Sequence, residues 1–316
     1  MGETMEKRQD AVIKSNELGW YKRAQHKSAE PYESTLFHED KMDFLPELMP
    51  LDEHPLWNAV SDSTKRMVAS YGWVMYNMRT ISIETKVVSP LCYSIIENKN
   101  QLTEDFDCRR IVTQTLVDES YHTLLSIEGI KGIVDNRNLP EIELPEQNFI
   151  KEYNCYLTEC GYDWQKDIAQ MALVVSSEVL ISDYLSSIAT SESIQPLCRQ
   201  VTRTHWKDEL AHANVFKLIA EKIMSKLTAE KKEFMIECVI KASGWFANKE
   251  LESWGRILTF VGVSRADEII DDCRAAPEKP TNLFADKKIK FLIDLLKNSQ
   301  YKNDRFTQPL MESVSC

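Results

Sequence analysis

Glycine and proline are scarce in this chain, at 9 and 11 of its 316 residues. β-Sandwiches and barrels use these residues at their many turns, so the low numbers argue against an all-β fold and favour long helices. Positive charge is also in deficit, and the formal net charge is -11. Because an acidic chain repels phosphate backbones and anionic membrane surfaces, we expect neither nucleic acid nor a membrane as a partner.

Several familiar motifs are absent as well. The eight cysteines include no C-x-x-C pair, which argues against a zinc ribbon or a thioredoxin motif. Without a G-x-G-x-x-G fingerprint, no bound nicotinamide or flavin is expected, and electrons for any redox chemistry must come from an external donor. The N-terminus lacks the apolar stretch of a signal peptide, and we expect no transmembrane helix. A reducing, cytoplasmic location follows as the default.

The chain is expected to contain an arm and one helical domain. Residues 1–45 are polar with scattered aromatic residues, and we expect an arm that packs along the body and is partly disordered at its start. Residues 46–316 lack repeats and Gly/Ser linkers, which favours a single all-α domain. The helical spacing of apolar residues predicts helices over 54–88 (kinked or ended at Pro90), 103–132, 149–160, 163–190, 194–224, 228–250, 265–274 and 286–298.

Two of these predicted helices carry the pattern E-x-x-H. Glu119 and His122 form the first copy, and Glu209 and His212 form the second. On an α-helix, residues three apart point to the same face, about 60° from one another. Repeated E-x-x-H motifs on separate helices are typical of bundles that hold two iron or two manganese ions, which also take one glutamate from each of two other helices.

Glu84 and Glu178 supply those two glutamates. Glu84 lies on the helix before the first E-x-x-H, and Glu178 lies in the middle of the apolar stretch ALVVSSEVLI. Burying an unpaired carboxylate costs on the order of several kcal/mol, so Glu178 needs a partner. The four glutamates would balance the charge of two Fe(II) ions. Carboxylate and imidazole ligands favour iron or manganese over copper or zinc.

His205 extends the second motif by one turn. His205, Glu209 and His212 follow an i, i+4, i+7 stripe, so the ring of His205 can reach the metal ion that Glu209 and His212 hold. Asp118 and Asp208 directly precede the two motif glutamates. They are either hydrogen-bond partners of the metal ligands or exposed helix charges. We assign no role to the remaining histidines, which are His26, His38 and His54.

The pattern H-x-x-x-E-x-x-H, here His205-W-K-D-Glu209-L-A-His212, resembles the AurF-like di-iron N-oxygenases, the p-aminobenzoate N-oxygenase family. The D-E-x-x-H of the earlier helix matches too, and the resemblance covers residues 70–250. It implies a ferritin-like four-helix bundle core with additional helices. It also implies seven metal ligands, which are Glu84, Glu119, His122, Glu178, His205, Glu209 and His212.

This resemblance further implies the activity. Two iron ions would activate O2, and oxygen would be inserted into the nitrogen of a small-molecule amine to give hydroxylamine, nitroso or nitro products. An external reductase, a homodimer and a place in secondary metabolism are the family's habits. Three alternatives stay open at this point: a di-iron oxidase that acts on carbon or generates a radical, an iron-storage protein, and a metal-free helical interaction module. The sequence does not predict which amine is the substrate.

Overall fold

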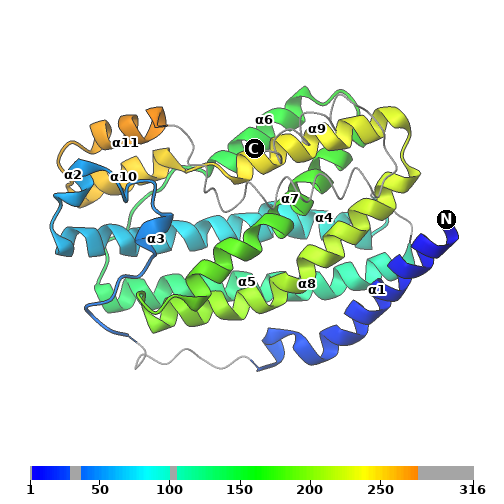
Figure 1. Cartoon of the computed structure of the whole chain (residues 1–316), viewed down its shortest axis with the longest axis horizontal. Coiled ribbons are helices and arrows are strands. Elements are labelled where there is room, and N and C mark those ends of the chain that lie inside the picture. The colour runs from blue at the N-terminus through cyan, green and yellow to red at the C-terminus, as the bar shows by residue number, and fades with distance from the viewer. Residues whose placement is uncertain (1, 29–36, 100–104, 277–316) are drawn as a thin grey trace.

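The computed structural model describes residues 2–28, 37–99 and 105–276 of the chain, and it is built from helices (Figure 1). In chain order the elements are α1 (Gly2–Arg23), η1 (Gln25–Ser28), η3 (Pro46–Leu48), α2 (Pro55–Asn58), α3 (Asp62–Ile83), η4 (Glu84–Val88), α4 (Ser89–Ile96), α5 (Phe106–Arg137), α6 (Asn148–Glu159), α7 (Asp163–Thr190), α8 (Pro196–Lys226), α9 (Ala229–Phe246), α10 (Leu251–Val261) and α11 (Ala266–Ala275). Within these residues, β pairing is limited to one isolated bridge between Met42 and Ile194. The all-α prediction is confirmed.

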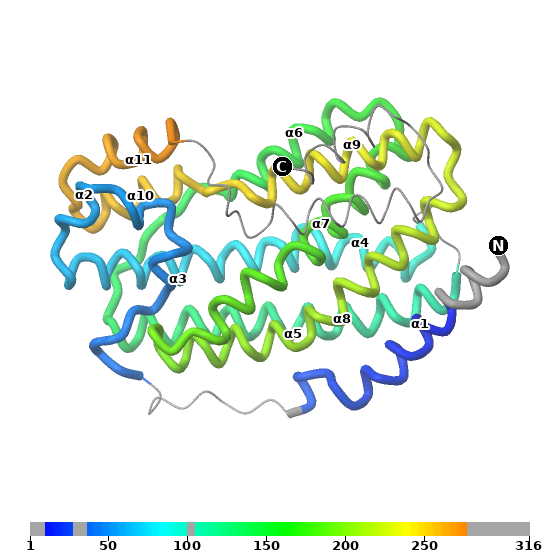
Figure 2. Tube along the Cα trace, in the orientation of Figure 1, coloured from blue at the N-terminus to red at the C-terminus, as the bar shows by residue number. Residues whose placement is uncertain are grey.

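The core is a bundle of four long helical rods: α3 with its continuation η4 and α4, then α5, α7 and α8. Contacts join α3 to α5, α5 to α8 and α7 to α8, and η4 touches both α5 and α7. The tube in Figure 2 shows these rods running side by side. The remaining helices surround the bundle: α9 packs on α7, α6 on α9, α10 on α3, and α11 on α10. The predicted ferritin-like core with additional helices is therefore confirmed.

Helix α7 is apolar on almost every face because it lies in the middle of the bundle. Its buried side chains include long runs of alanine, valine, leucine and isoleucine. By length and composition α7 is apolar enough to cross a membrane, which the sequence analysis did not expect of any segment, but 78% of its most apolar window is buried inside the protein. Such burial is what a core helix of a bundle shows.

Helix α5 runs further than expected. The predicted end at Gly129 or Gly132 is wrong, because α5 continues to Arg137 and ends at Asn138, whose φ of 51° is left-handed. The two glycines serve packing instead. A Cβ on Gly132 would lie 2.6 Å from the side chain of Leu197 on α8. The absence of side chains at these positions therefore lets α8 approach α5 closely.

The predicted kink or end before Pro90 takes the form of a π-helical turn, η4. The backbone N–H of Ser89 bonds to the carbonyl of Glu84, five residues earlier. Pro90 lies in the first turn of α4, where its missing N–H is tolerated. The first residue of the π turn is Glu84, one of the seven predicted metal ligands. Single π turns inside longer helices are frequently found at functional sites.

Part of the predicted arm forms a helix. Residues 2–23 form α1, which packs against α5 and α8 and lies along the outer side of the bundle (Figure 1). Ile13 and Ala24 are buried in this contact, and Arg110 on α5 donates to Glu17. The sequence analysis did not predict this helix because its apolar stripe is weak. The division into an arm over 1–45 and a domain over 46–316 stays a prediction, and the expected helix over 286–298 lies outside the described residues.

Gly72 on α3 provides a test of the packing against α10. A Cβ at this position would lie 2.7 Å from Cη2 of Trp254 and 3.4 Å from Phe44, both rigid rings. We expect Gly72→Ala to destabilise the chain by about 1–3 kcal/mol, since overpacking outweighs the gain in helix propensity. Gly244 on α9 is the matched control, because no atom lies within 4 Å of its Cβ position. Gly244→Ala should stabilise by about 0.5–1 kcal/mol. Equal denaturant midpoints for the two variants would contradict this reading.

Candidate metal centre

All seven predicted ligands meet in the middle of the bundle, and the four rods each contribute. Glu84 comes from the π turn after α3, the first E-x-x-H from α5, Glu178 from α7, and the other three residues from α8. Each is buried, with exposed fractions from 0 to 5%. Seven ionisable side chains in a core of apolar helices require mutual compensation or bound cations.

The side chains fall into overlapping groups that each suit a metal ion. The ligand atoms within each group lie within 4.8 Å of one another. The groups are Glu84, His122, His205 and Glu209; Glu119, His122, Glu209 and His212; and Glu84, Glu119 and Glu178. Shared members join these groups into one cluster, as a site for two neighbouring ions requires.

Glu119 and Glu209 occupy the centre of this cluster. Oε1 of Glu209 lies 3.0 Å from Nε2 of His205, 3.2 Å from Nδ1 of His122 and 3.4 Å from Nδ1 of His212. In Glu119, the distance from Oε2 to Nδ1 of His122 is 2.8 Å, and the distance from Oε1 to Nδ1 of His212 is 3.0 Å. Both carboxylates therefore face both motif histidines, and each would be shared between two of the groups that could hold a cation.

His205 lies beside Glu84 and His122 as well as Glu209. Its Nε2 lies 3.8 Å from Oε1 of Glu84, and its ring centroid is 4.0 Å from that of His122. These side chains come from η4 and α5, and with Glu209 they form one group around His205. That the ring reaches the ion held by Glu209 and His212 stays a prediction.

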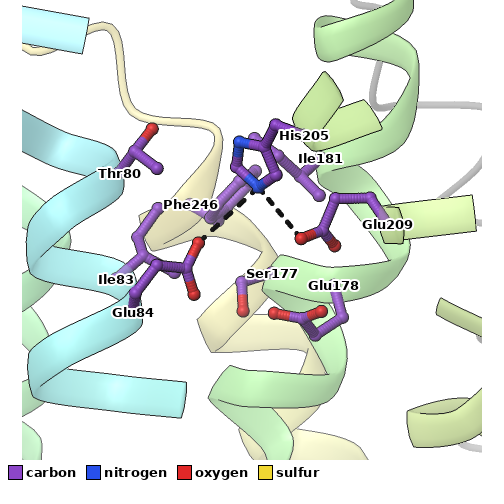
Figure 3. A pocket seen from close by; sticks show the side chains of 9 residues that line it. All are labelled: Thr80, Ile83, Glu84, Ser177, Glu178, Ile181, His205, Glu209 and Phe246. Atoms are coloured by element: carbon purple, nitrogen blue, oxygen red, sulfur yellow. Dashed lines mark hydrogen bonds and ion pairs between the residues drawn. The ribbon is translucent and has the colours of Figure 1, made fainter. Parts of the chain in front are cut away.

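A pocket opens on this side of the cluster (Figure 3). Its volume is about 240 Å³ including the mouth. Apolar side chains from three helices line one part, and carboxylates of the cluster line the other. The lining residues are Thr80, Ile83, Glu84, Ser177, Glu178, Ile181, His205, Glu209 and Phe246. A small molecule in this pocket would therefore lie against the cluster.

Several carboxylate oxygens in the cluster lack a hydrogen-bond partner. Within the described part of the chain, Oε2 of Glu84, Glu178 and Glu209 are buried and accept no hydrogen bond. Buried polar atoms in native proteins are nearly always satisfied. Oxygens that point inward without a donor, next to imidazole nitrogens, fit metal cations well. The donor set is carboxylate and imidazole without thiolate, which suits iron or manganese.

The four glutamates differ in charge state. Burial, and then the negative charges of Glu119 and Glu209, raise the pKa of both Glu84 and Glu178 well above the usual value. Burial also opposes ionisation of Glu119, but the charge of His212 and hydrogen bonds from His122 and His212 together outweigh it and lower the pKa of Glu119 to about 2. The charge of His212 and hydrogen bonds from the three histidines lower the pKa of Glu209 well below its usual value in spite of burial. The metal-free cluster therefore favours the protonated form of Glu84 and Glu178 and the ionised form of Glu119 and Glu209.

The histidines follow the same logic. Burial opposes the charge of His122 and His212, but the surrounding carboxylates together outweigh it. Hydrogen bonds to Asp208, Glu119 and Glu209 act on His122, and the charges of Glu119 and Glu209 act on His212. The pKa of both rings is therefore raised well above the usual value. Burial and the nearby charge of His122 lower the pKa of His205. His205 is hence neutral and can bind a cation without first losing a proton.

These pKa shifts predict competition between protons and metal ions. The metal-free cluster favours the protonated forms of Glu84, Glu178, His122 and His212, and a bound cation favours their deprotonated forms. We expect metal binding to release protons, and affinity to fall as pH decreases. Calorimetric titration in buffers of different ionisation enthalpy measures the released protons. An affinity that is constant between about pH 6 and 8 would contradict this prediction.

Asp118 and Asp208 are partners of the motif histidines, not exposed charges. Both are fully buried. Nε2 of His212 lies 3.1 Å from Oδ2 of Asp118, and Nε2 of His122 lies 3.4 Å from Oδ2 of Asp208. Each motif histidine thus turns Nδ1 toward the cluster and Nε2 toward an aspartate, the arrangement that orients metal-binding imidazoles.

Sequence reasoning missed residues of the arm that contact these aspartates. His26, to which we assigned no role, has Nδ1 3.3 Å from Oδ1 of Asp118. Trp20 donates from Nε1 to Oδ2 of Asp118 at 2.9 Å. The contacts span more than ninety positions in the sequence, so no local pattern could have shown them. His54 proved structural, because its Nδ1 accepts from the backbone N–H of Leu56 at the start of α2.

The fold and the cluster together define a class of protein: a four-helix bundle whose core gathers carboxylates and histidines in the pattern of dinuclear O2-activating enzymes. Comparison with known proteins gives the particular family. The family described as P-aminobenzoate N-oxygenase AurF matches residues 7–295, and the chain belongs to this family of di-iron oxygenases. It is an amine N-oxygenase of the oxidoreductase class.

One characterised relative supports this assignment. The chain is 26% identical over 234 residues to a 4-aminobenzoate N-oxygenase from Streptomyces thioluteus, a match that covers 74% of this chain and 70% of the relative. The family match is longer than the resemblance over 70–250 that the motifs indicated, and it includes most of α1. The arm is therefore part of the family's common sequence.

Proposed function

We propose that the chain binds two iron ions through Glu84, Glu119, His122, Glu178, His205, Glu209 and His212, and uses O2 to oxygenate the nitrogen of a small amine. The observation that carries this proposal is the convergence of all seven residues in one buried cluster that borders a pocket. Reduced iron bound there supplies electrons for the activation of O2. Membership of the family argues against the alternatives of iron storage and a metal-free interaction module.

The pocket places apolar side chains next to the cluster. Ile83, Ile181 and Phe246 line it together with the carboxylates of Glu84 and Glu178, and its enclosed part is small. An amine nitrogen that reached these carboxylates would face the cluster. Burial lowers the pKa of His205, which lines the same pocket, so this ring favours the uncharged form there.

An arylamine is the substrate class that membership of the family favours. The characterised relative is named for 4-aminobenzoate. In this chain, however, the pocket lining includes no cationic side chain. Arg79, next to Thr80, lies 3.9 Å from Glu250 and donates to the carbonyl of Phe246. We therefore propose arylamines with and without a carboxylate as substrates to compare.

The test of the proposed function begins with iron. Anaerobic loading with Fe(II) should saturate near two ions per chain. The reduced protein, mixed with O2 and a panel of arylamines, should give products that are heavier by the mass of added oxygen. Product analysis should place that oxygen on the nitrogen. The matching phenols, which lack the amine, should remain unchanged. Saturation at one ion, or a preference for zinc without O2 uptake, would overturn the di-iron assignment, and oxygen found on carbon would favour the carbon-oxidising alternative.

We also propose an external reductase as the electron donor, a homodimer, and a cytoplasmic role in secondary metabolism. The absence of a nucleotide-binding fingerprint in the sequence supports an external donor. Helices α5 and α8 expose the apolar side chains of Leu124, Ile127 and Leu210, which supports association with a second copy. Sedimentation velocity measures the oligomeric state, and a monomer at micromolar concentration would contradict the dimer.

A further inference from the structure

The cluster has two sides that differ in what covers them. On one side lies the pocket, bordered by α3, α7, α8 and α9. On the other side, Asp118 and Asp208 sit behind the motif histidines, and the arm formed by α1 and η1 packs over α5 and α8 (Figure 1). The pocket side has an opening next to the cluster. The arm side is closed by protein.

Two relays of hydrogen bonds run from the arm into the cluster. In the first, Nε1 of Trp20 donates to Oδ2 of Asp118 at 2.9 Å, and the same oxygen lies 3.1 Å from Nε2 of His212. Nδ1 of His26 lies 3.3 Å from the other oxygen, Oδ1. Asp118 thus has arm groups on both of its oxygens.

The second relay serves the other motif histidine. The backbone N–H of Gln25 donates to Oδ2 of Asp208 at 3.3 Å, and Nε2 of His122 lies 3.4 Å from this oxygen. Nη1 of Arg23 lies 3.9 Å from Oδ1 of Asp208. One short segment of the arm, Trp20–His26, therefore reaches both aspartates, and through them both motif histidines.

The energetic reason for the relays is the burial of the aspartates. Both side chains are 0% exposed, and a buried carboxylate without donors is costly. The arm provides donors that neither α5 nor α8 provides among the described contacts. Lys27 holds the arm in place locally, with Nζ 4.2 Å from the ring centroid of Trp20. Loss of an arm donor would free the aspartate to turn, and the imidazole that it orients would turn with it.

We propose that the N-terminal arm is a working part of the metal centre, in which Trp20 positions His212 through Asp118. On the other side, Asp208 positions His122 and is itself held by a hydrogen bond from the backbone of Gln25 and by the nearby charge of Arg23. This inference rests on the proposed di-iron function. Trp20 and Arg23 are positioning residues, since neither touches the cluster itself. The arm also keeps water away from the side of the cluster that faces away from the pocket.

The proposal predicts that each arm residue affects one iron position. Trp20→Phe keeps an aromatic ring but removes the N–H donor. We expect the affinity for one of the two Fe(II) ions to fall about 10- to 100-fold, as measured by competition with a chelator. Mössbauer spectra of the 57Fe-loaded variant should show one altered and one unaltered iron. Arg23→Gln should alter the other iron. A purely structural role of the arm would change both positions together and lower the melting temperature in parallel.

Tyr21→Phe is the control for the arm variants. Tyr21 lies next to Trp20 and is 59% exposed, so this variant should match the unaltered chain in iron affinity, Mössbauer spectrum and melting temperature. If the unaltered chain and this control bind two irons while Trp20→Phe and Arg23→Gln match them in affinity and spectrum, the arm proposal is wrong and the di-iron proposal stands. If the unaltered chain itself binds no pair of irons, the proposed function fails first.

Discussion

Glu178→Ala should remove iron and activity while it stabilises the iron-free chain. Glu178 is 2% exposed in the apolar helix α7, and its Oε2 accepts no hydrogen bond among the described residues. Because Glu178 is a proposed ligand, its removal should cut turnover by more than about a hundredfold. Even the mutation of a hydrogen-bond partner of a ligand costs about 10- to 100-fold in metal affinity or activity. Removing a buried carboxylate also removes its desolvation cost, so the melting temperature of the iron-free variant should rise.

The pH dependence of this gain has a definite sign. Burial raises the pKa of Glu178 in the folded chain. The unfolded chain therefore releases this proton more readily, and the carboxyl group costs the folded state more as pH rises above the unfolded pKa of about 4.5. The stabilisation by Glu178→Ala should accordingly grow as pH increases from there. Melting curves at several pH values, with iron content measured on the same samples, provide the test.

Glu178→Gln is the matched variant, because it keeps the volume and removes only the charge. It should lose iron like Glu178→Ala but avoid the cost of a cavity, so its melting temperature should be the higher of the two. Normal iron content and turnover in either variant would mean that Glu178 is not a ligand.

The second large effect is expected at His205. His205→Ala should still bind two irons, because six proposed ligands remain, but its yield of oxygenated amine should fall by more than about tenfold. The ring contacts Glu84, His122 and Glu209 and also lines the pocket. As a neutral ligand it would fill a coordination position without changing the charge of the site. Because His205 lines the pocket, removal of its ring should change how O2 reacts beside the substrate.

Rapid-mixing absorbance of the reduced variant with O2, followed by product analysis, separates the two parts of this prediction. His54→Asn is the control, since His54 lies outside the cluster and asparagine can replace its cap of α2. Unchanged absorbance kinetics and product yield in His205→Ala would show that the ring is a bystander. The distinction between this family and other di-iron oxidases would then need another basis.

More of the site than of its surroundings could be predicted from the sequence. The E-x-x-H motifs depend only on the local geometry of a helix, so Glu119, His122, Glu209 and His212 followed directly from spacing. Glu178 followed from the cost of a carboxylate in an apolar helix. In each case the signal lies within a few residues of the side chain concerned.

Features that depend on contacts between distant segments could not be predicted. Trp20 and His26 reach Asp118 only because α1 folds back over α5. The approach of Glu84 and His122 to His205 could not be predicted, because the geometry of one helix does not include the side chains that other helices bring to it. Asp118 and Asp208 were undecided for the same reason. Burial, which the sequence does not give, settled that they are partners of the histidines.

The π turn at Glu84 has a consequence for comparing this chain with others. Its hydrogen bond joins residues five apart, so the turn holds one residue more than a regular α-helical turn. Deleting one residue between 84 and 88 would rotate everything beyond it by about 100°, and would turn the buried Leu91 and Ile95 of α4 out of the core. A relative with a regular helix here therefore aligns with this chain only across a one-residue gap. A gapless alignment would pair residues from different faces of the helix.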